Sequence, residues 1–267
     1  MKIKFRYSYT LQNNTFSGLF VGNNIVTLNE VDSTNSYLKD VLSKSAPLLE
    51  GTVIMAEKQY AGRGQMDSTW LSEAGKNLTF SVLLNPSFLS IDRQFDLSKV
   101  VSLALNDMLS LYFGDSAKIK WPNDSYINNQ KIGGILIENI IQGNRIKHAI
   151  IGIGLNVNQT DFEPALKNVT SFKKILNVDY KLASLLADIC KAIEVRYLQL
   201  KAGKISEITT CYLQKLYLFN QLVSFKIGGE VKRSKIIGVS QEGKIKLETK
   251  GTIKEFGLKE IEFISLP

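Results

Sequence analysis

The chain has 267 residues, of which 44% are hydrophobic, and this is enough for one large folded domain or for a main domain with a small second one. Its formal net charge of +8 favours anionic partners such as nucleotides, nucleic acid or an acidic protein. No stretch reaches the apolar length of a membrane span and the first ten residues lack a signal-peptide core, so we expect a cytoplasmic protein with no membrane partner.

Histidine and cysteine chemistry is almost excluded. His148 is the only histidine, and no serine or cysteine elbow lies near it. Cys190 and Cys211 lie in segments of helical pattern without CxxC spacing, which predicts buried reduced thiols and no metal site. Catalysis must therefore use lysine, arginine, carboxylates or an added metal ion.

The N-terminal half predicts alternating strands and helices. Residues 3–9 and 24–30 have the period of edge strands, and residues 32–44 change to a helical period, with Ser33 or Thr34 placed to cap the helix. The next predicted elements are a buried strand at 51–59, a Gly-rich polar loop at 61–77, a strand at 78–85 and a helix at 97–113 that ends at Gly114.

The second half predicts further strands, two helices and a different C-terminal texture. We expect three strands rich in Ile and Val at 117–121, 133–141 and 145–159. Two helices are expected at 180–201 and 205–218, and a tail of short alternating strands begins at residue 222. Strands cluster between helices without regular βα alternation, which indicates an α+β fold with a mixed sheet. We expect a main domain over residues 1–218 and a small β-barrel over residues 219–267.

Polar loops interrupt the apolar strands and carry residues suited to anions. The first contains Gly62-Arg63-Gly64, in which glycines allow close approach of the backbone and an arginine can present a planar fork to a phosphate or carboxylate. A solvent-exposed hairpin turn is the competing interpretation. In the last of these loops, Asn156 and Asn158 alternate with apolar residues and could face the same cleft.

The stretch KWPNDSYINNQKIGG, residues 120–134, is the richest in such features. Lys120 and Lys131 flank a polar turn with Asn-Asp at 123–124, so their ammonium groups could converge on one face of a hairpin. The adjacent glycines at 133–134 weaken a strand unless something must approach its backbone. A simple hairpin needs neither both lysines nor both glycines, which favours a ligand site.

Five motifs occur in the order seen in biotin protein ligases. They are EVDSTN at 30–35, QYAGRG at 59–64, KWPND at 120–124, KIGGILIE at 131–138 and GIGLNVN at 152–158. The chain resembles a biotin-[acetyl-CoA-carboxylase] ligase of this family, including a class II synthetase-like catalytic domain and an SH3-like C-terminal barrel. The resemblance implies activation of biotin with ATP and transfer to a lysine of a biotin carboxyl carrier domain.

The resemblance also implies catalytic roles. Lys131 matches the lysine that contacts biotin and nucleotide and is our first choice, with Lys120 second and Arg63 in the closing loop. Asn123 and Asp124 are expected to hold the nucleotide phosphates with Mg²⁺ or to orient the lysines, and Asp124 could assist deprotonation of the acceptor amine. No metal site made of protein ligands alone is expected; Mg²⁺ would come with ATP, near Asp124.

By the same resemblance, other residues are expected to bind the two substrates. The ureido ring of biotin, a neutral donor and acceptor, suits hydroxyls and amides. The biotin set is Ser33, Thr34, Asn35, Gln59, Arg63, Gly64, Gln65, Lys131 and Gly134. The ATP set is Arg63, Trp70, Lys120, Asn123, Asp124, Lys131 and Asn156, with Trp70 either packed near the adenine or a plain core tryptophan.

Two departures from the family pattern affect the expectations. Many members have a second arginine and a glycine after Gly-Arg-Gly, where this chain has Gln65-Met66-Asp67, so we expect weaker retention of the adenylate. Only 31 residues, of strand-like pattern, precede DSTN, so we expect a monofunctional ligase without a DNA-binding module. Whether the chain forms a homodimer stays open.

Two other functions compete with biotin ligation. A lipoate or octanoate ligase of the same superfamily also joins an acid to a carrier lysine, but WPND followed by KIGG and the polar DSTN set fit a ureido ring better. A nucleic-acid-binding protein would use the basic tail, which has few interleaved aromatic residues.

Overall fold

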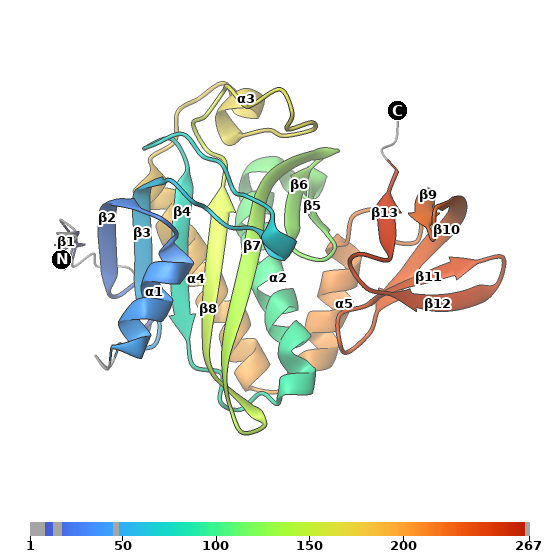
Figure 1. The fold of residues 1–267 in the computed structure, drawn as a ribbon, viewed down its shortest axis with the longest axis horizontal. Coiled ribbons are helices and arrows are strands. Elements are labelled where there is room, and N and C mark those ends of the chain that lie inside the picture. Colours follow the sequence, from blue (N-terminus) through green and yellow to red (C-terminus); the bar gives the residue numbers. More distant parts are fainter. Residues whose placement is uncertain (1–8, 13–17, 45–47, 265–267) are drawn as a thin grey trace, which may run out of the picture.

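The computed structural model describes residues 9–12, 18–44 and 48–264. Its larger part is an eight-stranded sheet with the strand order β1-β2-β3-β4-β8-β7-β6-β5 (Figure 1). β2 and β3 run parallel, and the other neighbouring strands run antiparallel. The strands are β1 (Tyr9–Gln12), β2 (Ile25–Val31), β3 (Val53–Gln59), β4 (Leu78–Leu84), β5 (Ala117–Lys120), β6 (Asp124–Ile127), β7 (Gln130–Gln142) and β8 (Arg145–Leu155).

Helices cover both faces of this sheet, as Figure 1 shows. α1 lies on one face, α2 and α4 lie on the other, and α5 packs against α2. The helices are α1 (Thr34–Ser43), α2 (Gln94–Phe113), α3 (Phe172–Leu176), α4 (Leu182–Lys201) and α5 (Ile205–Lys215), with short 3-10 turns η1 (Gln65–Asp67), η2 (Ile91–Arg93) and η3 (Gly114–Ser116). None of the helices in the described ranges is long and apolar enough to span a membrane.

The two covered faces form two hydrophobic cores. Leu38 of α1 packs with Leu28, Ile54 and Ile150 on one face, and the second, larger core joins the other face to α2 and α4. β4, in the middle of the sheet, is buried at every position because both of its faces are covered. Burial of apolar surface in these cores stabilises the fold by about 25 cal/mol per Å², and this holds the sheet between the helices.

A second, antiparallel sheet of five strands follows α5 and is consistent with an SH3-like domain. Its core residues belong to the same hydrophobic cluster as those of α2, and Trp121 Nε1 donates to the Gly243 carbonyl at 2.8 Å. The division into domains at residue 218 remains a prediction. The strands, in the order β12-β11-β10-β9-β13, are β9 (Leu222–Ile227), β10 (Glu230–Val239), β11 (Ile245–Thr249), β12 (Thr252–Phe256) and β13 (Ile261–Phe263).

The α+β fold class with a mixed sheet is confirmed, and three local predictions need correction. Ser33 is the N-cap residue of α1, but its hydroxyl makes no capping hydrogen bond within the part of the chain that the structure describes. The short helix α3 was not expected. The single hairpin expected over 120–134 is wrong, because β6 forms between the two lysines and divides the stretch into two hairpins. The strand predicted over 3–9 lies, apart from its last residue, outside the described residues.

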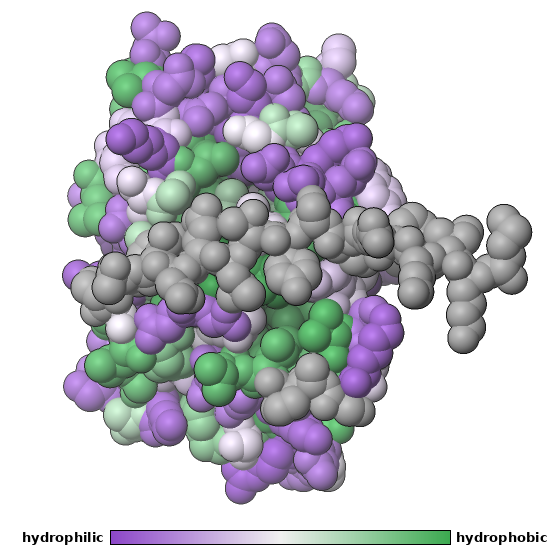
Figure 2. Space-filling model, turned by 90° about the vertical axis from the view of Figure 1, so that its left-hand side faces the viewer, coloured by the Kyte–Doolittle hydropathy of each residue, from purple (hydrophilic) through white to green (hydrophobic). Residues whose placement is uncertain are grey.

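The sheet end that carries β1 presents a mixed surface. Figure 2 shows hydrophilic and hydrophobic residues interspersed on this face of the molecule. Apolar atoms contribute a large share of any folded protein's surface, so this distribution alone does not indicate a partner.

Glu194 of α4 anchors the segment that precedes β2. Its carboxylate accepts backbone hydrogen bonds from Leu19 and Phe20, both at 2.7 Å, and from Val21 at 3.0 Å. Burial by itself raises the pKa of Glu194, but the three N–H donors outweigh burial and the pKa lies below its usual value. The ionised carboxylate therefore stabilises the fold.

Replacing Glu194 by glutamine should lower the free energy of unfolding by about 2 kcal/mol at pH 7, since hydrogen bonds to a charged acceptor are lost. Because the pKa of Glu194 is lower in the folded protein, its ionised form stabilises the fold at pH values above the unfolded pKa of about 4.3. This contribution is lost as the pH falls through the folded pKa. The difference between wild type and variant, measured by urea denaturation, should thus shrink below about pH 4. Glu207→Gln, at an exposed carboxylate on α5, is the control and should change stability by less than about 0.5 kcal/mol; an equal loss in both variants would contradict the assignment.

Candidate functional site

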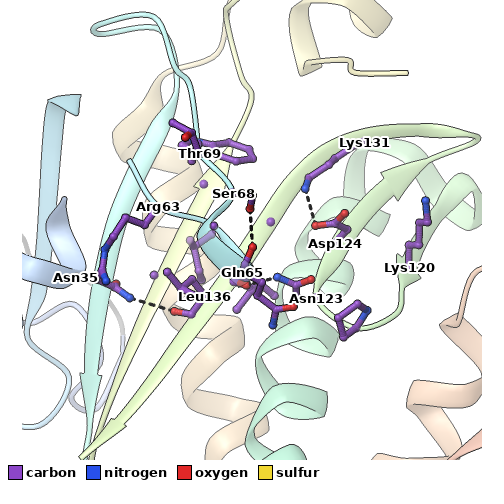
Figure 3. Close-up of a pocket in the computed structure, with 18 of the residues that line it drawn as sticks. Asn35, Arg63, Gln65, Ser68, Thr69, Lys120, Asn123, Asp124, Lys131 and Leu136 are labelled. Atoms are coloured by element: carbon purple, nitrogen blue, oxygen red, sulfur yellow. Dashed lines mark hydrogen bonds and ion pairs between the residues drawn. The ribbon is translucent and has the colours of Figure 1, made fainter. Parts of the chain in front are cut away.

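A cavity of about 300 Å³ lies between the β3–β4 loop, the central strands β7 and β8, and β13 of the small sheet. Figure 3 shows side chains entering it from the loop, from α1 and from the turn between β5 and β6. Backbone of β8 forms part of its floor because Gly152 and Gly154 have no side chain to fill the space. The cavity therefore collects residues that are far apart in the sequence.

A polar cluster forms the end of the cavity next to α1. The backbone N–H of Thr34 donates to Gln59 Oε1 at 2.8 Å. The buried Ser81 hydroxyl lies 2.7 Å from Thr34 Oγ1 and 2.6 Å from Asn35 Oδ1. Asn35 Nδ2 donates to the Leu136 carbonyl at 3.2 Å, so its amide is oriented by the protein. These groups form a fixed set of neutral donors and acceptors.

Lys131 and Asp124 form an ion pair in the cavity wall. Lys131 Nζ lies 2.6 Å from Asp124 Oδ1, and the two side chains are 31% and 22% exposed. A Cβ at Gly134 would lie 3.4 Å from Asp124 Oδ1 and 3.6 Å from Lys131 Nζ, which is ordinary van der Waals contact, so the pair packs closely beside this position. Because the pair is partly exposed to the cavity, an incoming anion can contact the ammonium without its full desolvation.

Lys120 faces a different environment, and Figure 3 shows it apart from the Lys131–Asp124 pair. Its Nζ donates to the Tyr126 hydroxyl at 3.0 Å and lies 4.7 Å from the centre of that ring and 5.0 Å from the Phe263 ring. Burial lowers the pKa of Lys120, and the Asp124 carboxylate opposes this shift. Burial raises the pKa of Tyr126 to about 12, so its hydroxyl stays protonated at neutral pH.

The loop between β3 and β4 folds back on itself over the cavity. The Gly64 N–H donates to the Ser68 carbonyl at 2.7 Å and the Trp70 N–H donates to the Gly62 carbonyl at 2.9 Å. A Cβ at Gly62 would lie 2.3 Å from the Trp70 carbonyl oxygen, so only glycine permits this close approach. Met66, at the tip, has φ 54°, a conformation that glycine adopts more readily.

Trp70 lies against β8, and Arg63 is held by a carboxylate. A Cβ at Gly154 would lie 2.3 Å from the Trp70 indole, which therefore rests directly on the backbone of β8. The Trp70 Nε1 is buried without a hydrogen-bond partner among the described residues. Arg63 forms an ion pair of 2.6 Å with Glu138 of β7, on the side of the cavity where Asn35 lies (Figure 3).

Most of the residues predicted for the site line this cavity together. They are Ser33, Thr34, Asn35, Gln59, Arg63, Gly64, Gln65, Trp70, Lys120, Asn123, Asp124, Lys131 and Gly134. Asn156 and Asn158 do not line it. Asn156 donates to the Thr170 carbonyl and Asn158 to the Tyr180 carbonyl, so both hold the segment around α3. The Asn156 Oδ1 is buried without a partner among the described residues.

Some lining or supporting residues were not predicted. Leu258, Ile261 and Phe263 of the small sheet line the cavity, and nothing in their local pattern distinguishes them from ordinary barrel residues. Ser81 lies inside an apolar strand run, where a buried hydroxyl is a recognisable signal because it needs a partner. Glu138 ends the KIGGILIE motif, so its position next to the cavity could have been suspected.

A divalent cation would find few protein ligands here. No group of three or more histidine, cysteine or acidic residues is placed to hold a metal within the described residues. Among the described side chains that line the cavity, one is acidic, and it is Asp124. One carboxylate suits Mg²⁺ that arrives with phosphate oxygens and keeps several water ligands.

Comparisons with known proteins show what this chain is similar to. The family model described as the biotin/lipoate A/B protein ligase family matches residues 28–156. The bifunctional ligase/repressor BirA of Bacillus spizizenii is 29% identical over 253 residues, covering 91% of this chain and 74% of that protein. The biotin-[acetyl-CoA-carboxylase] ligase of Paracoccus denitrificans is 38% identical over 133 residues, covering 49% of this chain and 53% of that protein.

A solved structure gives the same result for the fold. The biotin protein ligase from Aquifex aeolicus in complex with biotin and ATP superimposes with a TM-score of 0.74 at 28% identity, covering 89% of this chain and 97% of that chain. With the five motifs in order around one cavity, these similarities support a biotin protein ligase, and the chain is an enzyme of that type.

Proposed function

We propose that this enzyme activates biotin with ATP as biotinyl-5'-AMP and transfers the biotinyl group to a lysine of a biotin carboxyl carrier domain. The observation that carries the proposal is one cavity with a neutral polar cluster at one end and the Lys131 ammonium in its wall. The first suits a ureido ring, and the second suits a carboxylate next to a phosphate.

The first step has an electrostatic difficulty. A biotin carboxylate oxygen must attack the α-phosphorus of ATP while the bond to pyrophosphate breaks, so two anions must approach each other. At 4 Å and an effective dielectric constant of 20, two unit charges repel by about 4 kcal/mol. A fixed ammonium at a similar distance from both anions offsets this repulsion and stabilises the charge that develops on the phosphoryl oxygens.

Lys131 is the residue best suited to this role. Its Nζ is already fixed by Asp124, and its exposed fraction lets it contact an anion in the cavity. Lys120 lies in another part of the cavity wall, against the rings of Tyr126 and Phe263. It could bind the leaving pyrophosphate or help to orient the small sheet. Asp124 would hold Mg²⁺ that arrives with ATP, which supplies charge neutralisation to the phosphates.

The second step requires a neutral lysine amine from the carrier. Attack of this amine on the acyl carbon forms the amide and releases AMP, and the amine loses one proton. Asp124 is the carboxylate in the described cavity lining, and it could accept this proton once Lys131 contacts the phosphate. The loop over the cavity would protect the mixed anhydride from water until the carrier arrives.

Titration calorimetry tests the proposal directly. Biotin alone should bind, and ATP added to the biotin complex should release pyrophosphate and leave a tightly bound product. Lipoate binding in place of biotin would instead assign the chain to the lipoate branch of the family. Absence of binding by either acid would contradict the proposal.

Replacing Lys131 by methionine should reduce the rate of adenylation by about 10²- to 10³-fold, since one stabilising charge at the developing anion is lost. Pyrophosphate release is the measurement, with circular dichroism to show that the variant is folded. Lys173→Met removes a lysine of similar exposure that pairs with Asp179 outside the cavity, and it should retain wild-type activity. Adenylation by Lys131→Met within about threefold of wild type would remove the catalytic assignment.

Replacing Gly154 by alanine should displace the Trp70 indole, because the new Cβ would lie 2.3 Å from the ring. If Trp70 packs near the adenine, KM for ATP should rise by roughly tenfold, while KM for biotin changes less. Gly238→Ala is the matched control on another strand, where the nearest heavy atom to the new Cβ lies at 3.8 Å. An unchanged KM for ATP would argue that Trp70 is a structural residue only.

The Gln65-Met66 tip should retain the adenylate less well than an arginine-rich loop, because it brings fewer positive charges to the phosphate. Replacing Gln65 by arginine should therefore slow the release of free biotinyl-adenylate by several fold. Release can be followed by trapping the free intermediate with hydroxylamine during single turnover. Equal release rates in wild type and variant would contradict this expectation.

A further inference from the structure

Glu138 of β7 connects two parts of the site. Its Oε2 accepts from Arg63 at 2.6 Å and from Asn35 Nδ2 at 2.9 Å. Arg63 belongs to the loop over the cavity, and Asn35 belongs to the first turn of α1. One carboxylate oxygen therefore joins the closing loop, α1 and the central sheet.

The network continues into the buried part of the sheet. Asn35 Oδ1 lies 2.6 Å from the hydroxyl of Ser81, which is fully buried on β4, and the same hydroxyl contacts Thr34. A Cβ at Gly152 would lie 2.5 Å from Asn35 Oδ1, so the amide of Asn35 is tightly enclosed. Asn35 thus has one available orientation, with its N–H groups toward Glu138 and the Leu136 carbonyl.

The β3–β4 loop is attached near its ends, where the Ala61 N–H donates to the Asp32 carbonyl and the Glu73 N–H donates to Gln159 Oε1, both at 3.0 Å. Its segment 62–69 has few other polar attachments to the rest of the protein. Its backbone hydrogen bonds, from Gly64 to Ser68, from Ser68 to Gln65 and from Trp70 to Gly62, are internal. The side chain of Asp67 is left aside. Among the other described groups of residues 62–69, only Arg63 forms an ion pair or hydrogen bond with a residue outside the loop, and its partner is Glu138. Beyond residue 69, the Trp70 indole adds an apolar contact with β8.

We propose that Glu138 is a positioning residue, which holds the closing loop over the cavity through Arg63 and orients Asn35 in the polar cluster. The inference deepens the proposed function, since it assigns to Glu138 the ordering of the wall that biotin would contact. A loop ordered before the ligand arrives loses less conformational entropy on binding, so the clamp should favour substrate affinity.

The opposite role is also testable, because the same ion pair could hold Arg63 away from a phosphate. Lys131 is paired with Asp124 in a different part of the wall, and Figure 3 shows Arg63 on the Asn35 side. If Glu138 restrained Arg63 in this way, removing its charge would improve catalysis. If Glu138 positions the loop, removing its charge must impair binding and loosen the loop. The two roles predict changes of opposite sign.

Glu138→Gln is the test variant, since it keeps the size of the side chain and removes the charge. In the ligand-free full-length protein, the amides of Gly64 and Trp70 should exchange with solvent about 10-fold faster than in wild type. KM for biotin should rise by about 5- to 30-fold, while kcat falls less than threefold. Glu30→Gln is the matched control, because it removes an ion pair of 2.7 Å with Lys58 between neighbouring strands outside the cavity lining.

A double variant isolates the pair. Arg63→Gln alone should loosen the loop as Glu138→Gln does, and the combined variant should be no worse in amide exchange than either single variant. Additive effects would show that Glu138 acts without Arg63 and would overturn the proposal. Unchanged exchange of the two amides, or a lower KM for biotin in Glu138→Gln, would overturn it as well.

Hydrogen exchange keeps this inference separate from the proposed function. The exchange of the Gly64 and Trp70 amides is measured without any substrate, so it reports on the clamp even if the acid proves to be lipoate. Failure of the wild-type protein to bind biotin would reject the function but not the clamp. Binding of biotin by wild type with unaltered exchange in Glu138→Gln would reject the clamp but not the function.

Discussion

Two carboxylates, Asp124 and Glu138, hold Lys131 and Arg63 in place, and the arrangement of the cavity depends on these two pairs. A half-buried ammonium or guanidinium without a partner would move toward water, since the loss of hydration is expensive. Pairing with Asp124 keeps Lys131 in the wall, and pairing with Glu138 keeps Arg63 beside α1. Each pair remains partly exposed, so the cation stays available to an anionic ligand.

The glycines of the central strands make this arrangement sterically feasible. Gly152 lies against the Asn35 amide and Gly154 receives the Trp70 indole, while the Lys131–Asp124 pair packs beside Gly134 at ordinary contact distance. At positions 152 and 154 an added Cβ would lie 2.5 Å from Asn35 Oδ1 and 2.3 Å from the Trp70 indole, so both neighbours need a glycine there. Glycine weakens a strand, and the burial of β4 and β8 against helices on both faces compensates for that loss. The same sheet therefore provides stability and the space for the cavity.

Local sequence patterns predicted the main elements because their periods are strong. The 20 residues of α2 end at Gly114, as the helical pattern and the glycine indicated, and β3, β4 and β8 follow apolar runs. β6 escaped prediction because Asp124 and Ser125 are typical turn residues, and pairing with both β5 and β7 overrides that preference. α3 is a five-residue helix, too short for a periodic signal.

The site was predictable where motifs are continuous and unpredictable where it depends on long-range packing. Thirteen of the predicted residues line one cavity, but Asn156 does not, and it donates instead to the Thr170 carbonyl next to α3. That segment is held by backbone and side-chain contacts that no local pattern encodes. Phe263 lies about 140 residues from Lys120 in the sequence, and only docking of the small sheet brings its ring to 5.0 Å from the Lys120 ammonium.

Docking of the small sheet also completes the cavity, which is lined by residues of both sheets. Trp121 directly follows Lys120, and its indole N–H donates to Gly243 in the small sheet, so the β5–β6 turn is tied to that sheet on one side. On its other side the turn carries Asp124, which holds Lys131. A shift of the small sheet would thus move the turn and alter the Lys131–Asp124 pair. Because the small sheet shares one close-packed hydrophobic core with the large sheet, its position is joined to the Lys131–Asp124 pair through Trp121 and the β5–β6 turn.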